Sequence, residues 1–389
     1  MSVVPPNQAL PRTAAPAAVD PLAGYDHWLL GAALALLGVG VVMVASASVS
    51  VAAKSSGDPL HFFWRQVAYL TVGMGLAWLA MRVPLISWHR SGPLLLAAAA
   101  ILLVLVLVPG IGREVNGSRR WIALAGLNVQ PSELAKLFYI VYLAGYLVRR
   151  EAQVRHVLSG FVKPIALMAL LGALLLGEPD FGAMAVMFAT TLGMLFLAGV
   201  PLRSFALWVI LIIVLLAVSA LLEPYRAARV FTFLNPWADP YGKGFQLTQA
   251  LIAVGRGEWF GVGLGAGVQK LFYLPEAHTD FLFAVLAEEL GLGGALGVIG
   301  LFGCVVWRGL IAARQASLAA QPFGAYLAYG GALLIGLQAV VNIGVNLGLL
   351  PTKGLTLPLM SYGGSSLVVS CVAVGLLLRV GFEARRRVT

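Results

Sequence analysis

Long apolar runs recur along nearly the whole chain, and they limit it to a small set of folds. About 20 predominantly apolar residues are enough for a helix to cross the hydrocarbon core of a bilayer. Hydrophobic residues make up 60% of the 389 positions and charged residues only 11%, whereas soluble proteins carry about 25% charged residues. We therefore expect an all-α, polytopic integral membrane protein with about ten transmembrane helices. The candidate spans lie at 27–48, 62–81, 92–109, 131–148, 160–176, 181–199, 203–222, 280–307, 323–349 and 360–380.

The basic residues between the runs predict the topology. Ten crossings place both termini on one side, and the basic C-terminal sequence "RVGFEARRRVT" shares that side with the basic stretch around 148–163. The positive-inside rule makes this side the cytoplasm. The net charge of +10 is then explained by topology and anionic lipid rather than by nucleic acid. Loops near 110–130, 223–279 and 350–359 are expected outside.

The chain divides into one membrane domain and two tails. Residues 1–24 are rich in Pro and Ala without periodicity and predict a disordered cytoplasmic tail. Residues 25–381 form the transmembrane domain, and 382–389 a basic cytoplasmic tail. The outer loop at about 223–279 is the longest, and its aromatic residues suit a structured loop at the membrane interface: Trp237, Trp259 and Tyr273.

Three clusters of polar residues lie at the outer ends of the runs, and ionisable residues within spans mark functional sites by default. The first is "YLPEAHTDFLFAVLAEELG", residues 273–291. Asp280 begins the eighth run, and Glu288 would share its helix face about 12 Å further on. Asp280 could alternatively cap the helix. Glu288 and Glu289 could alternatively be structural partners of basic residues.

The second cluster is "EVNGSRRWIALAGLNVQPSELAK", residues 114–136. Arg119 and Arg120 fall in an outer loop, where they could also bind lipid headgroups. Lys136 falls just inside the fourth run and needs a partner or water. Between the fifth and sixth runs, "GEPDFG" places Glu178 and Asp180 in a tight outer turn. A turn role is the default for Asp180, and lining of a polar cavity is the alternative.

The third cluster is "LGLLPTKGLTLPLMSYGGSSL", residues 347–367. Pro and Gly interrupt the apolar pattern beside Lys353, and non-helical backbone at that depth must line a cavity or be buried in protein. In the preceding run, polar residues recur every fourth position and predict interhelical hydrogen bonds: Gln338, Asn342 and Asn346. These clusters together indicate an outward-facing polar cavity for an anionic substrate, which the protein could either transport or transform.

The motifs "NGSRRWI", "QPSELAK", "EPDFG", "LPEAHTDFLFAVLAEELG" and "GLLPTKGLTLPLMSYGGSS" resemble those of the SEDS family (shape, elongation, division and sporulation). The resemblance covers nearly all of the chain after the N-terminal tail. "EAHTDF" and "PTKGLTLP" look like its cell-division branch, while Asn128 departs from relatives that carry a basic residue there. The resemblance implies a peptidoglycan glycosyltransferase that polymerises lipid II at the periplasmic face of the inner membrane during septal wall synthesis.

The family's catalytic carboxylate lies in its "HTD" motif, which carries over to Asp280. As general base it would deprotonate the acceptor hydroxyl, and Glu276 and His278 would position sugars or support it. The departing diphosphate needs cations rather than an acid, for which Arg120, Lys136 and Lys353 are candidates. Glu288 and Glu289 would form an inner supporting shell. Mg²⁺ or Mn²⁺ could add to the cations. The remaining substrate-binding candidates are Arg119, Asp180, Ser361, Tyr362 and Gly363.

The implied partners are lipid II and the growing glycan strand, a class B penicillin-binding protein as septal transpeptidase, and division regulators such as the FtsQ, FtsL and FtsB subcomplex. Two alternatives share the same charged site. One is a lipid II flippase, and the other is a non-catalytic division scaffold that recruits the transpeptidase. Release of polymer and polyprenyl diphosphate from lipid II would separate all three.

Overall fold

The computed structural model describes residues 24–115, 118–124, 127–201, 203, 205–210, 214, 218, 233–242, 244–352 and 354–388. Nine of the ten predicted runs coincide with helices in these ranges. The run at 203–222 lies mostly outside them, as does nearly all of the predicted N-terminal tail. The nine helices are α1 (His27–Ser56), α2 (His61–Arg82), α3 (Leu85–Leu107), α4 (Pro131–Arg149), α6 (Leu158–Gly177), α7 (Phe181–Leu197), α11 (Leu282–Leu318), α12 (Pro322–Asn346) and α13 (Gly364–Val388).

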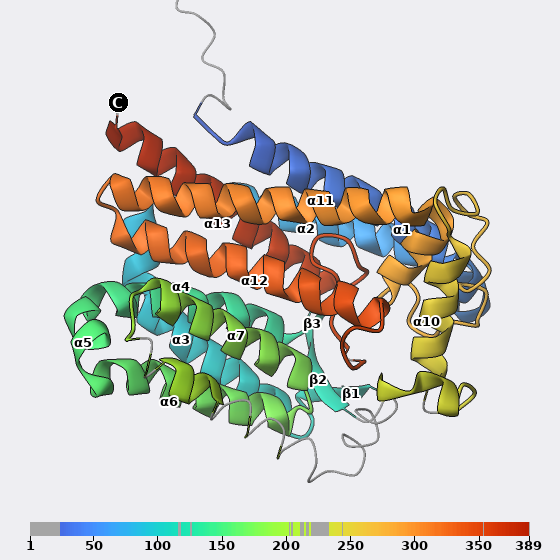
Figure 1. The fold of residues 1–389 in the computed structure, drawn as a ribbon, viewed down its shortest axis with the longest axis horizontal. Coiled ribbons are helices and arrows are strands. Elements are labelled where there is room, and N and C mark those ends of the chain that lie inside the picture. The colour runs from blue at the N-terminus through green and yellow to red at the C-terminus, as the bar shows by residue number, and fades with distance from the viewer. Residues whose placement is uncertain are drawn as a thin grey trace, which may run out of the picture.

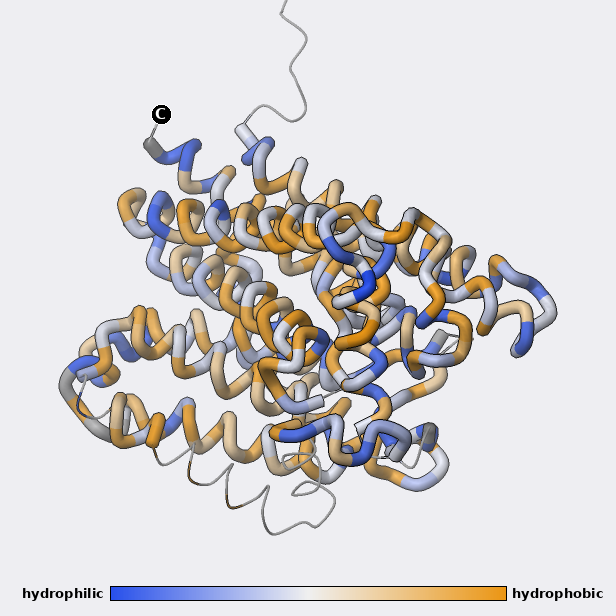
Figure 2. The backbone as a smooth tube through the Cα atoms, turned by 45° about the vertical axis from the view of Figure 1, so that its right-hand side comes forward, coloured by the Kyte–Doolittle hydropathy of each residue, from blue (hydrophilic) through white to orange (hydrophobic). Residues whose placement is uncertain are grey.

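Six of the described helices are long and apolar enough to cross a membrane: α1, α3, α6, α11, α12 and α13. The helix α7 is apolar but shorter, with 17 residues. The hydrophobic residues follow the helices, and the hydrophilic residues gather at the turns and helix ends (Figure 2). The predicted helical membrane architecture is therefore confirmed, and the count of ten crossings stays a prediction.

An ion-pair cluster places both ends of the described chain on one face. Asp26 caps α1 by accepting a hydrogen bond from Leu29 N at 3.0 Å. Its carboxylate also binds Arg308 of α11 at 2.5 Å and Arg385 of α13 at 3.2 Å. The start of α1 and the end of α13 consequently meet at the end of the bundle that also carries α5 (Glu151–His156) (Figure 1).

The opposite end carries the outer loops, which contain structure that the apolar pattern did not predict. Residues 112–129 form a three-stranded antiparallel sheet in the order β1 (Gly112–Val115), β2 (Ser118–Leu124), β3 (Leu127–Val129). The loop predicted at 223–279 contains the short 3-10 helix η1 (Pro236–Ala238) and the helix α10 (Phe245–Arg256). Both regions lie at the same end of the bundle (Figure 1).

A break inside α11 joins this outer loop to the bundle. Gly291 has φ 66° and ψ −166°, a conformation open to glycine, and it interrupts the helix. The loop backbone supplies the missing hydrogen bonds, because Val262 N donates to Glu288 O at 3.0 Å and Gly263 N donates to Glu289 O at 3.1 Å. The helix break and the loop are therefore a single unit.

We predict that the 223–279 loop faces the periplasm and that the C-terminus faces the cytoplasm. After Cys304 and Cys371 are replaced by Ala, single cysteines at Ala238 and Arg387, both exposed, can be labelled in intact cells. An impermeant maleimide should react at position 238 and reach position 387 only after permeabilisation. Labelling of position 387 in intact cells would contradict the topology.

Candidate active site

Side-chain amides on α12 hold two non-helical segments inside the bundle. Asn342 Nδ2 donates to Leu355 O at 2.5 Å and to Asp280 O at 2.9 Å. Asn346 Nδ2 donates to Asp280 O at 3.0 Å, and its Oδ1 accepts from Ala284 N at 3.0 Å. The predicted interhelical hydrogen bonding is confirmed. It fixes the backbone of Asp280 beside the chain between α12 and α13.

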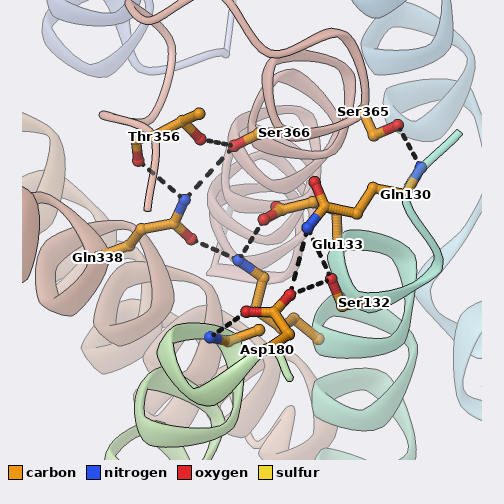
Figure 3. A network of polar contacts seen from close by, with 10 residues as sticks. Gln130, Ser132, Glu133, Asp180, Gln338, Thr356, Ser365 and Ser366 are labelled. Carbon is orange, nitrogen blue, oxygen red and sulfur yellow. Dashed lines mark hydrogen bonds and ion pairs between the residues drawn. The ribbon is translucent and has the colours of Figure 1, made fainter. Parts of the chain in front are cut away.

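The third amide of the stripe completes a buried polar network around Lys136 (Figure 3). Lys136 Nζ donates to Glu133 Oε1 at 2.8 Å and to Gln338 Oε1 at 2.7 Å, and Lys136 is fully buried. Gln338 Nε2 in turn donates to Thr356 O at 3.1 Å. The expected partner of Lys136 is therefore Glu133, which neutralises its charge. This pairing speaks against the prediction that Lys136 stabilises a diphosphate.

Asp180 has the turn role that was the default interpretation. Its Oδ1 accepts from Ala183 N at 3.1 Å and so caps α7. Its Oδ2 accepts from Ser132 Oγ at 2.8 Å and from Gln130 Nε2 at 3.2 Å. Asp180 thus joins the start of α7 to the start of α4 (Figure 3), and these contacts explain its carboxylate without a substrate.

Asp280 lies in the turn before α11 rather than in the helix, so it does not share a helix face with Glu288 as predicted. The N-cap residue of α11 is Phe281, and the first-turn N–H of Ala284 donates to Asn346 Oδ1. Asp280 therefore does not occupy the N-cap position that the capping alternative gave it. Its side chain is half-exposed, and Oδ2 lies 3.3 Å from the place where a Cβ on Gly354 would stand. The carboxylate is therefore positioned at the backbone of the non-helical chain between α12 and α13, of which residues 347–352 and 354–363 are described and which is called the broken segment below.

Arg120 approaches the same place from the outer sheet. Its Nη1 lies 4.0 Å from the same Cβ position on Gly354. The guanidinium is held by two backbone carbonyls, because Nε donates to Glu178 O at 3.0 Å and Nη2 donates to Pro179 O at 2.6 Å. Arg120 and Asp280 thus meet at Gly354. Lys353, the residue before Gly354, lies outside the described residues, and its role stays a prediction.

Glu178 is a feature that sequence reasoning placed in a turn but gave no role. Its side chain is fully buried, and neither carboxylate oxygen has a hydrogen-bond partner among the described residues. Burial, reinforced by nearby Asp180, raises the pKa of Glu178 to about 9, although Arg120 opposes the shift. The carboxyl is therefore protonated at neutral pH and does not neutralise the charge of Arg120. An acidic pair beside a proline was the only signal in the sequence.

His278 packs into an aromatic cluster beside Asp280. Its ring centroid lies 4.7 Å from that of Phe62 and 5.5 Å from that of Tyr362, and its carbonyl accepts from Tyr362 N at 3.0 Å. Burial lowers the pKa of His278 even though Glu276 opposes the shift. His278 is therefore neutral at pH 7, and it supports the site through packing rather than through charge.

The other predicted binding residues divide between structural and surface positions. Ser361 is buried, and its Oγ accepts from Leu357 N at 3.0 Å within the broken segment. A Cβ on Gly363 would stand 3.0 Å from the Thr356 side chain. Glu276 is exposed and accepts from Thr279 Oγ at 2.8 Å. Arg119 points away from Arg120 along the strand and pairs with Glu114 at 3.3 Å.

Glu288 and Glu289 hold the outer loop rather than Asp280. Both are buried. Glu288 accepts from Val268 N at 3.0 Å and from Gln269 N at 3.2 Å. Glu289 pairs with Lys270 at 2.5 Å and accepts from Ser46 Oγ of α1 at 2.8 Å. The alternative interpretation, structural partners of basic residues, fits these contacts, and an inner shell for Asp280 does not follow from them.

The fold and these residues define a class: a multi-pass helical membrane protein with a carboxylate and a cation close together at its loop-bearing end. The chain belongs to the FtsW/RodA/SpoVE family. The profile of that family, described as "Cell cycle protein", matches residues 27–386.

Relatives and solved structures agree with this membership. The chain is 58% identical to "Probable peptidoglycan glycosyltransferase FtsW" of Nitrosococcus halophilus over 92% of this chain and 93% of the relative. The same name belongs to a relative in Thioalkalivibrio sulfidiphilus, also 58% identical, over 92% and 90%. A chain from a peptidoglycan synthase complex that coordinates polymerization and crosslinking is 33% identical with a TM-score of 0.75, covering 92% and 98%. Rod shape determining protein RodA of Thermus thermophilus is 31% identical with a TM-score of 0.67, covering 94% and 98%.

Glu178→Gln tests whether the buried carboxyl is protonated. The folded protein keeps this proton up to about pH 9, whereas an ordinary carboxyl releases it near pH 4.5. The free energy of unfolding of the wild type therefore falls as pH rises through that interval, and glutamine removes this dependence. The melting temperature of Glu178→Gln, relative to wild type, should rise between pH 5 and 9, by about 2–4 °C per kcal/mol. The exposed Glu258→Gln is the control, and parallel curves for Glu178→Gln and wild type would contradict the assignment.

Proposed function

We propose that this chain is a peptidoglycan glycosyltransferase that polymerises lipid II on the periplasmic side of the bacterial inner membrane. The observation that carries the proposal is the meeting of the half-exposed Asp280 and Arg120 at Gly354. The names of the relatives support the same activity. A base and a cation in one place suit attack by a hydroxyl on a sugar that leaves a diphosphate.

Asp280 acts as the general base in this mechanism. It takes the proton of the acceptor sugar's 4-hydroxyl, which is a poor nucleophile until deprotonated, and such a step contributes about 10²–10⁴-fold to the rate. Two amides on the carbonyl of Asp280 fix its backbone, so the carboxylate has a defined position. Preorganisation of this kind avoids reorganisation of the site during the reaction.

Arg120 stabilises the departing diphosphate, which leaves without a proton. Its charge is available because its hydrogen bonds run to carbonyls and because Glu178 is neutral at pH 7. Lys353 would add a second cation. No group of three or more His, Cys, Asp or Glu within the described ranges is arranged to hold a metal ion.

The reaction is a single displacement in this proposal. The acceptor oxygen attacks the anomeric carbon opposite the diphosphate, so an α-linked donor gives a β-linked polymer. A double displacement needs a second carboxylate about 5 Å from the first, as in retaining glycosidases. Glu288 and Glu289 are engaged by the outer loop, and Asp180 is engaged by α4 and α7, which argues against these three as nucleophiles.

The chain works at the division septum with both termini in the cytoplasm. Its partner is a class B penicillin-binding protein, which crosslinks the glycan strand, and the FtsQ, FtsL and FtsB subcomplex regulates the pair. The relative from a complex that coordinates polymerization and crosslinking supports such a partnership. Chemistry at the loop-bearing end of the bundle is compatible with a partner on the periplasmic side.

Asp280→Asn should abolish polymerisation, because asparagine keeps the shape of the side chain but cannot accept the proton. Purified protein with its transpeptidase partner is given fluorescent lipid II, and polymer and released polyprenyl diphosphate are measured. We expect a loss of at least about 100-fold. Asp58→Asn, in the exposed turn between α1 and α2, is the matched control.

The same assay separates the alternatives. If the wild type moves labelled lipid II across the membrane of proteoliposomes but leaves the diphosphate bond intact, the protein is a flippase. A scaffold would support division with Asp280→Asn in place. A normal yield of polymer from purified Asp280→Asn protein would contradict the proposed role of the carboxylate.

A further inference from the structure

Among the described residues of the helices, the buried and half-buried lysines and arginines are paired with carboxylates, with one exception that bears on the site. Burying a charge is costly unless it is paired. Four cations of the described helices and outer loop meet that condition through ion pairs with Glu133, Glu289, Asp26 and Glu383: Lys136, Lys270, Arg308 and Arg379.

Arg65 on α2 is the exception. It is half-buried, and it forms no ion pair or hydrogen bond with the described residues. Pairing with a carboxylate does not explain its presence, and a half-buried charge in this position needs another partner.

The surroundings of Arg65 belong to the active site. Gln66, the next residue, donates to Met360 O at 3.3 Å and to Ser361 O at 3.4 Å, so α2 runs along the end of the broken segment. Phe62 lies three residues before Arg65 on the same face of α2, and its ring centroid is 5.1 Å from that of Tyr362. Arg65 therefore follows, on its helix face, a residue that packs against Tyr362, whose N–H donates to the carbonyl of His278.

Aromatic rings and an unpartnered polar atom complete this place. The rings of Phe62 and Tyr362 are 5.1 Å apart in an edge-to-face arrangement, and both side chains are half-exposed. His278 is only 9% exposed, and its Nδ1 has no hydrogen-bond partner among the described residues. Aromatic faces beside a cation and a free ring nitrogen are suited to a sugar that carries an anionic group.

We propose that Arg65 forms a second anion-binding subsite of the active site, bounded by Phe62 and Tyr362, that holds the anionic group of a lipid-linked sugar. This inference rests on the proposed function, in which two lipid-linked sugars must be bound at once. Arg120 lies at Gly354, in the middle of the broken segment, whereas Arg65 lies on α2 one helical turn after Phe62, which packs against Tyr362 at the end of that segment. One cation then serves the donor substrate and the other serves the acceptor.

Binding measurements on the full chain in nanodiscs test the subsite. The probes are undecaprenyl diphosphate and lipid II, and the variants are Arg65→Gln and Arg65→Lys. The control is Arg82→Gln, at the other end of the same helix, where the guanidinium lies over the Trp78 ring. Because a charged hydrogen bond is lost, Arg65→Gln should weaken binding by about 10–100-fold. Arg65→Lys, which keeps the charge but not the planar guanidinium, should retain part of the affinity and bind more tightly than Arg65→Gln.

The two probes identify the anion. Weaker binding of both probes assigns Arg65 to a diphosphate, and weaker binding of lipid II alone assigns it to a carboxylate of the peptide. Equal affinities of Arg65→Gln and Arg82→Gln for both probes would overturn the subsite, as would a failure of Arg65→Lys to restore binding. If the wild type shows Arg65-dependent binding but forms no polymer, the proposed function fails and the subsite stands.

Discussion

The structure depends on satisfying backbone polar groups where helices break inside the bundle. In a membrane, non-helical backbone is tolerated only where protein or a polar site supplies its hydrogen bonds. Asn342 and Asn346 supply them from one face of α12, reaching Leu355 O in the segment before α13 and Asp280 O in the turn before α11. Replacing these amides by apolar residues would leave buried carbonyls unpaired, at about 1–3 kcal/mol each. The same amides place the proposed base.

Basic residues that stabilise packing are paired with carboxylates, whereas the basic residue at the candidate site is not paired in this way. Lys136 and Lys270 are neutralised by Glu133 and Glu289 and stabilise helix and loop packing. At the site the pattern is reversed, because the hydrogen bonds of Arg120 run to the backbone carbonyls of residues 178 and 179 while the adjacent buried carboxyl keeps its proton. Positive potential is thereby preserved where an anionic leaving group would lie. A buried acid can thus act by remaining neutral.

The outer loop is held to the site by the same helix that follows the proposed base. The break at Gly291 exposes two carbonyls of α11 to the loop backbone, and the side chains of Glu288 and Glu289 bind loop residues that follow. The loop, the helix break and the turn that carries Asp280 are therefore connected through the first part of α11.

The sequence by itself determined the helical membrane architecture, because apolar runs of that length have few other folds. It also determined the amide stripe and the turn role of Asp180, since four-residue spacing and a helix start are local patterns. Tertiary structure alone decided which charges are paired. Lys136 donates to the side-chain amide of Gln338, which lies 202 residues away in the chain. Arg65 carries no sequence signal that separates it from other cations near helix ends. Burial and contacts between distant parts of the chain decide which charged side chains are paired, and a local sequence pattern predicts neither.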